Sequence, residues 1–196
     1  MGDHLTMENF IKKYTSEFVE VLNTLDGEKL IALYESMEQA KKNKKNIYVL
    51  GNGGSSASAS HWVCDFNKGT NYEESERLQV FSLSDNTPLF SALGNDFSYE
   101  DVFIEQLKNY LTLGDLVIGL SVSGNSENIV RALEYATAME ADTYSIVGDH
   151  DGKMQEVSNE ALIVPSKNYG IVEDIHMYVC HMISQYMYEE NVSRFN

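Results

Sequence analysis

The chain has 196 residues, 43% of them hydrophobic, and its 30 acidic residues against 14 Lys and Arg give a net charge of −16. This length suits one domain, and so acidic a chain repels polyanions, so we expect no nucleic-acid partner. The sequence has no apolar run of membrane-spanning length, no signal-peptide pattern and no CxxC spacing between its two cysteines. We therefore expect a cytoplasmic protein with no membrane partner.

Apolar residues at helical spacing predict two helices before the first strand, within residues 7–43. The first carries Phe10, Ile11, Tyr14, Phe18, Val21 and Leu22, and the second carries Leu30, Leu33, Tyr34, Met37 and Ala40. These apolar faces outnumber what one face of a sheet needs. We therefore expect this helical extension to pack on the sheet domain and on partner subunits.

Short apolar strands then alternate with helices along the chain. The strands are predicted at 46–50, 78–83, 115–121, 143–148 and 161–165. The helices are predicted at 54–66, 87–94, 99–111, 126–139, 151–157 and 170–190. This alternation predicts an α/β fold, with a five-stranded parallel sheet between two helical layers in a three-layer αβα sandwich of the flavodoxin-like kind. The stretch 67–76 shows neither a strand nor a helix pattern and is expected to be a polar loop.

Two serine-rich turns follow predicted strands and precede predicted helices: Gly51-Asn-Gly-Gly-Ser-Ser56 and Ser121-Val-Ser-Gly-Asn-Ser126. Free backbone N–H groups, the helix dipole and serine hydroxyls make such turns anion sites. The first turn lacks the third glycine of a dinucleotide fingerprint and the Gly-Lys-Ser/Thr of a P-loop, so we reject both. The turns predict a phosphorylated ligand bound at the carboxyl ends of the strands.

Carboxylate and histidine side chains recur at helical spacing on two of the predicted helices. His61 and Asp65 are four residues apart, and Glu173 and His181 are eight apart with Met177 between them. Two such helices can hold a divalent metal or carry out acid/base chemistry. For a single histidine, packing or capping is the simpler interpretation, but the two pairs together with the two turns favour function. The neighbouring Cys64 and Cys180 are expected to be small core residues rather than ligands.

Three motifs together resemble the sugar-isomerase (SIS) domain: Gly51-Asn-Gly-Gly-Ser55-x5-His61, Leu93-Gly-Asn-Asp96 and Ser121-x-Ser-Gly-Asn-Ser126. The ending Glu173-Asp-Ile-His176-Met-x3-His181 is most similar to the bacterial phosphoheptose isomerases. These enzymes convert sedoheptulose 7-phosphate to an aldoheptose 7-phosphate. The resemblance covers nearly the whole chain, as a single SIS domain over 1–196, and implies a homotetramer with sites near subunit boundaries.

The resemblance also implies roles for individual residues. Ser121, Ser123 and Ser126 would hold the phosphate; Asn52, Gly53 and Ser55 would line the sugar, and Asp96 would meet its hydroxyls. Asp65 and His181 would be the acid/base groups, with Glu173 as a further candidate base. A divalent metal, zinc in family members, would be held by His61, Asp65, Glu173 and His181.

The chain departs from the family pattern at several positions, and Lys68 only approximates the basic residue that the family has a few positions past 65. The chain has Asp65 and Asp174 where the family has glutamate, Glu173 where it has glutamine, and Val122 where it has threonine. Because aspartate is one methylene shorter than glutamate, three alternatives stay open. Either the backbone lies closer to the substrate here, or Glu173 acts as the base in place of Asp65, or the site serves metal binding more than catalysis. A carboxylate at position 173 would strengthen a divalent cation site.

The sequence thus predicts an aldose–ketose isomerase, an intramolecular oxidoreductase that acts on sedoheptulose 7-phosphate through an enediol and yields D-glycero-D-manno-heptose 7-phosphate. One alternative is a non-catalytic adaptor or sugar-phosphate sensor with the same domain. Another is an isomerase for a different ketose phosphate, which the changes at Asp65 and Val122 favour.

Overall fold

The computed structural model describes residues 6–195 and has one five-stranded parallel sheet in the order β2-β1-β3-β4-β5. The strands are β1 (Asn46–Gly51), β2 (Gln79–Ser82), β3 (Leu116–Ser121), β4 (Asp142–Gly148) and β5 (Glu160–Val164). Each agrees with its predicted range to within one residue at either end. The direction of the crossovers changes between β1 and β3, which are neighbours in the sheet, so ligands are expected beyond their carboxyl ends.

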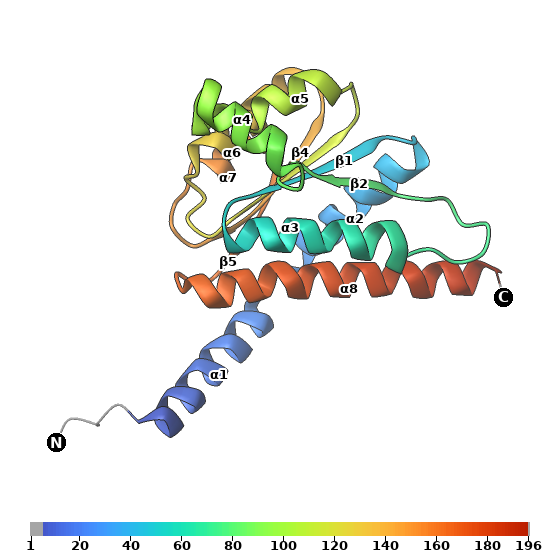
Figure 1. Cartoon of the computed structure of the whole chain (residues 1–196). Coiled ribbons are helices and arrows are strands. Elements are labelled where there is room, and N and C mark those ends of the chain that lie inside the picture. The colour runs from blue at the N-terminus through green and yellow to red at the C-terminus, as the bar shows by residue number, and fades with distance from the viewer. Residues whose placement is uncertain (1–5, 196) are drawn as a thin grey trace.

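Helices cover both faces of the sheet (Figure 1). On one face lie α2 (Gly27–Lys42), α3 (Gly54–Cys64) and α8 (Tyr169–Phe195). On the other lie α4 (Thr87–Asp96), α5 (Ile104–Tyr110), α6 (Glu127–Ala138) and α7 (Met154–Val157). The predicted αβα sandwich is confirmed. Among residues 6–195, no helix is both long and apolar enough to span a lipid bilayer.

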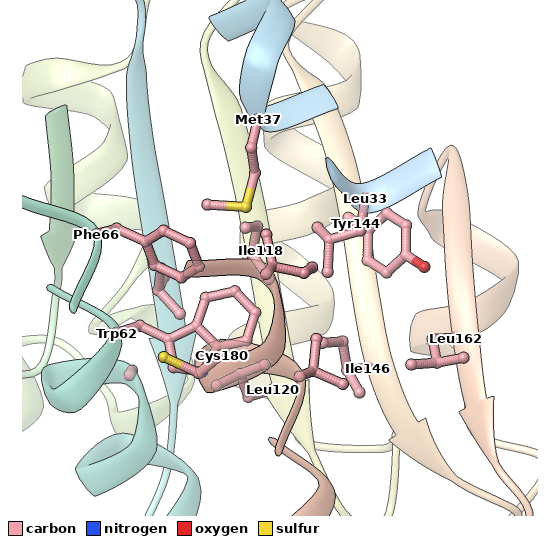
Figure 2. Packing of buried hydrophobic residues seen from close by; sticks show 14 of the residues in the cluster. Leu33, Met37, Trp62, Phe66, Ile118, Leu120, Tyr144, Ile146, Leu162 and Cys180 are labelled. Carbon is pink, nitrogen blue, oxygen red and sulfur yellow. The ribbon is translucent and has the colours of Figure 1, made fainter. Parts of the chain in front are cut away.

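Each face of the sheet has its own hydrophobic core. Figure 2 shows the core under α2, α3 and α8, where Trp62 and Phe66 pack near Cys180 and against the sheet residues Ile118 and Leu120. All of these side chains are fully buried. This core fixes α3 and α8 on the sheet and thereby sets the positions of the polar residues on both helices.

The helix α1 (Met7–Thr24) extends away from the rest of the molecule (Figure 1). Thr6 caps its first turn by accepting a hydrogen bond from the Asn9 amide. Among its residues only Val21 is buried, whereas the large apolar side chains of Met7, Phe10, Ile11 and Val19 are exposed.

The predicted helix 151–157 is shortened to α7, and two further segments differ from their predicted form. The predicted helix 99–111 is divided into a 3-10 turn, η2 (Tyr99–Asp101), and α5. Ser98 and Arg131 both donate hydrogen bonds to the Asp101 carboxylate, and these bonds keep η2 separate from α5. The predicted loop 67–76 begins inside a π-helical turn, η1 (Asp65–Gly69). There the Asn67 side chain pairs with both backbone groups of Val80 on β2, at 2.7 and 2.9 Å. Neither tertiary contact is visible as a local pattern.

Candidate active site

The turn after β3 brings three serine hydroxyls together. Ser121 Oγ lies 3.2 Å from Ser126 Oγ and 3.5 Å from Ser123 Oγ, and it accepts a hydrogen bond from the Gly124 amide. Gly124 has a φ of +64°, a conformation that glycine adopts without strain. Ser126 is the N-cap of α6 but makes no side-chain capping bond, so its hydroxyl remains available at the helix N-terminus.

The turn after β1 forms the opposite wall of the same small pocket, which has a volume of about 160 Å³. Asn52 and Ser55 line this pocket together with Ser121, Ser123 and Ser126. A side chain at Gly51 would overlap the backbone of Ser55, so the tight turn into α3 requires glycine there. The structure therefore joins the two serine turns, as the sequence predicts. Gly53 lies in the same turn with a φ of +54°, but is exposed and does not line the pocket.

One group of possible metal ligands occurs within residues 6–195: His61, Asp65 and His181. His61 Nε2 lies 3.1 Å from His181 Nε2, and Asp65 Oδ2 lies 3.3 Å from the former and 3.5 Å from the latter. Ligand atoms around a tetrahedral zinc are about 3.4 Å apart, given bonds of about 2.0–2.2 Å. The spacing of these three donor atoms is therefore compatible with their binding one divalent metal.

Three contacts fix α8 against α3, the sheet and the turn η1. Trp62 Nε1 donates to the His176 carbonyl at 3.1 Å, and the His176 ring lies 3.2 Å from the Ile146 carbonyl on β4. The Cys180 thiol lies 3.8 Å from Asp65 Oδ2 as a donor, and burial, with the Asp65 charge beside it, raises the pKa of Cys180. These contacts bring His181 next to His61 and Asp65.

The two cysteines differ in their surroundings. Cys180 is buried, as predicted, but Cys64 is exposed, so the prediction of a core position for Cys64 is wrong. Trp62 and Phe66 occupy the buried face of this helical stretch, and Cys64 lies between them in sequence, on the opposite side of the helix. Tyr178 is also exposed, whereas Trp62 is in the core.

Glu173 and Asp96 lie outside the histidine–aspartate group. The Glu173 carboxylate packs against Gly54 in the first turn of α3 and lines the serine pocket. Asp96 is exposed at the end of α4, where it accepts a hydrogen bond from Asn95 Nδ2 at 2.8 Å, and it does not line the pocket. The pocket also includes Val122 and Tyr169. Tyr169 is not predictable as a site residue, because it stands alone at the start of α8 without a motif.

The helices α3 and α8 run side by side in the same direction (Figure 1). Their first turns carry Ser55 and Glu173 at the pocket. Further along lie His61 on α3, Asp65 at the start of η1 and His181 on α8. The six residues from Ser55 to His61 correspond to roughly 9 Å of helix. The arrangement offers an anion pocket at one end and ionisable groups at the other.

The model of the family described as SIS domain matches residues 9–148. A phosphoheptose isomerase of Helicobacter pylori is 33% identical over 185 residues, which cover 93% of this chain and 94% of that protein. One from a Nitratiruptor species is 34% identical over 145 residues, which cover 74% of this chain and 77% of that protein. The chain belongs to the phosphoheptose isomerase branch of the SIS domain family.

A solved member of this branch has the same fold. The structure of the phosphoheptose isomerase from Neisseria gonorrhoeae superimposes with a TM-score of 0.85 at 24% identity, over 93% of this chain and 98% of that one. The SIS fold predicted from the motifs is thereby confirmed.

Proposed function

We propose that this phosphoheptose isomerase family member converts sedoheptulose 7-phosphate to D-glycero-D-manno-heptose 7-phosphate through an enediol. The observation that carries the proposal is the pairing of a serine-lined pocket with the His61–Asp65–His181 group along two parallel helices. Their separation of roughly 9 Å along α3 is comparable to the length of an extended seven-carbon sugar phosphate.

In this proposal the pocket binds the phosphate through hydroxyls and backbone N–H groups. Ser121, Ser123 and Ser126 surround it on one side, and Asn52 and Ser55 contact the adjoining sugar from the opposite wall. Gly53 lies outside the lining, and we propose that it contacts the sugar through its backbone where the ligand extends beyond the pocket. Binding energy from the unreactive phosphate end places the first two carbons at the other end of the site. Asp96 lies outside the pocket of a single subunit. We therefore propose that it contacts sugar hydroxyls only in the assembled protein.

Asp65 and His181 carry the proton transfers. One group removes the proton next to the carbonyl, and the other moves protons between the two oxygens of the enediol. Asp65 lies at the first position of the π-helical turn η1, a feature that often marks functional sites. The wider turn is the structural basis on which we propose that the shorter aspartate acts at a position where the family has glutamate.

A divalent metal, zinc in the proposal, would be held by His61, Asp65 and His181. Glu173 would complete the set only if its carboxylate moved away from Gly54. A bound cation would supply Lewis-acid polarisation of the sugar carbonyl. We further propose that the protein is cytoplasmic and forms a homotetramer with sites near subunit interfaces. The exposed apolar face of α1 supports the assembly.

Substitution of His181 tests the assignment. We expect His181→Ala to lower kcat on sedoheptulose 7-phosphate at least ~100-fold, because it removes a general acid/base group. Tyr178→Ala, an exposed change on the same helix outside the histidine–aspartate group, serves as the control and should leave turnover near wild type.

The wild-type protein also separates the alternatives. If it binds sedoheptulose 7-phosphate without turnover, with and without added zinc, it is a sensor rather than an isomerase. Turnover of another ketose phosphate in preference to sedoheptulose 7-phosphate would replace the proposed substrate. An unchanged kcat in His181→Ala would contradict the role given to this residue.

A further inference from the structure

The side-chain amide of Asn52 is held by two residues that do not line the pocket. Asn52 Nδ2 donates to Asn128 Oδ1 at 2.9 Å, and Asn128 Nδ2 donates to Asn52 Oδ1 at 3.0 Å. Tyr99 adds a third bond, from its hydroxyl to Asn52 Oδ1 at 2.8 Å. Three bonds therefore fix one amide of the pocket wall, and both partners lie far from Asn52 in sequence.

Tyr99 is itself positioned before any ligand arrives. It belongs to η2, which is bound to α6 by an ion pair in which Arg131 Nη1 lies 3.0 Å from Asp101 Oδ1. The hydrogen bonds from Ser98 and Arg131 lower the pKa of Asp101, as expected for a carboxylate that accepts from two donors. The Tyr99 ring also packs edge-on against Phe90, with ring centroids 5.9 Å apart.

The direction of these bonds determines what Asn52 can offer. A phenol is a better hydrogen-bond donor than acceptor, because its oxygen lone pair is delocalised into the ring. The amide oxygen of Asn52 therefore faces Tyr99 and accepts two bonds, which uses both of its lone pairs. One N–H of Asn52 Nδ2 bonds Asn128, and the other has no partner within residues 6–195.

We propose that Tyr99 and Asn128 are positioning residues that hold Asn52 as a hydrogen-bond donor toward an oxygen of the bound sugar phosphate. Without them the amide is free to rotate and to present either its oxygen or its nitrogen. The inference rests on the proposed function only in naming the ligand. It adds that this contact selects an acceptor oxygen on the ligand.

The expected kinetic signature follows from the place of Asn52 in the site. Asn52 lines the serine pocket, whereas the proton-transfer groups His181 and Asp65 belong to a separate group. An interaction with a part of the ligand that does not react stabilises the ground state and the transition state alike. Loss of the positioning bonds therefore raises KM and leaves kcat within about twofold of wild type.

The first test compares Tyr99→Phe with Tyr110→Phe. Both tyrosines are about half exposed, but the Tyr110 side chain is not near Asn52. We expect Tyr99→Phe to raise KM for sedoheptulose 7-phosphate about fivefold, the usual effect of one hydrogen bond, and Tyr110→Phe to leave it unchanged. Asn128→Leu removes two bonds and should raise KM further. Because Asn128 is buried, its thermal melt is recorded as well.

The second test asks whether Tyr99 acts through Asn52. In an Asn52→Ala background, Tyr99→Phe should have no additional effect on KM or on the Kd for the sugar phosphate. A Tyr99→Phe protein with wild-type KM and Kd, or effects that simply add in the double variant, would overturn the inference. If the wild-type enzyme shows no turnover, the proposed function fails, and the Kd measurements still decide the positioning role.

Discussion

Glu173 brings a negative charge to a pocket that is proposed to bind a phosphate. Its carboxylate lies at the first turn of α3, where the helix dipole favours an anion, and it also lines the serine pocket. This position separates it from the His61–Asp65–His181 group. In the proposed binding mode, this charge faces the phosphate end of the ligand rather than its reactive end.

We predict that Glu173→Gln lowers KM for sedoheptulose 7-phosphate severalfold, because it removes a like charge from the phosphate pocket, and keeps kcat within about threefold. Steady-state kinetics at two salt concentrations measure this effect. Asp174→Asn, the same charge change on an exposed neighbour that does not line the pocket, is the control. A kcat loss of about 100-fold in Glu173→Gln would instead make Glu173 a base or an essential ligand.

Much of the candidate site is predictable at the level of single residues. The serine turns follow apolar strands, and His61 with Asp65 has helical spacing, so local patterns reveal them. The roles of Tyr99 and Asn128 are not predictable, since they depend on bonds to Asn52 across 47 and 76 residues. Similarly, the spacing of Glu173 and His181 on one helix does not reveal that Gly54, which lacks a side chain, leaves room for the Glu173 carboxylate beside α3.

The pairing of α3 with α8 is the feature of the fold that forms the site. Trp62 and His176 join the two helices, and His176 is fully buried. Burial lowers the pKa of His176 to about 4, although its bond to Ile146 opposes this shift. Unfolding exposes the ring to water and restores its ordinary pKa.

This difference predicts a pH dependence of stability. Because the folded pKa is below the unfolded value, the unfolded chain binds more protons between about pH 6.5 and pH 4, and stability falls as the pH drops through this window. The contribution of His176 from pH 7 to pH 5 is about 2 kcal/mol. Urea unfolding at both pH values should show a smaller loss for His176→Gln than for wild type. An equal loss in both proteins would show that other groups control the dependence.

The elements themselves were largely predictable. Apolar runs with β-branched residues mark the five strands, and helical periodicity marks the helices of both layers. The missed details, the π-helical turn η1 and the separate turn η2, depend on Asn67 bonding β2 and on Asp101 bonding α6. Such tertiary contacts override the local pattern.

On the scale of the whole molecule, apolar surface remains uncovered where α1 leaves the sheet domain. Phe10, Ile11 and Val19 are exposed on α1. A groove of about 550 Å³ between α2 and α8 is lined mainly by apolar side chains, among them Leu30 and Ile31. Exposed apolar surface of this extent is typical of subunit interfaces, which supports the proposed tetramer.

We predict that Phe10→Ser combined with Ile11→Ser shifts the protein from a tetramer to smaller species. The two changes remove apolar area from the exposed face of α1 without touching the sheet core. Light scattering coupled to size exclusion measures the mass, and Lys12→Ala on the same helix is the control. A monomeric wild-type protein, or an unchanged mass in the double variant, would contradict this assignment.

The most direct test of the isomerase proposal follows sedoheptulose 7-phosphate by NMR in D₂O with the purified wild-type protein. We expect conversion to an aldoheptose 7-phosphate, with deuterium from the solvent at the carbon next to the carbonyl, because an enediol forms through protein-mediated proton transfer. A folded protein that binds the sugar phosphate yet yields neither aldose nor deuterium exchange, in the presence of zinc, would show that it is not this isomerase.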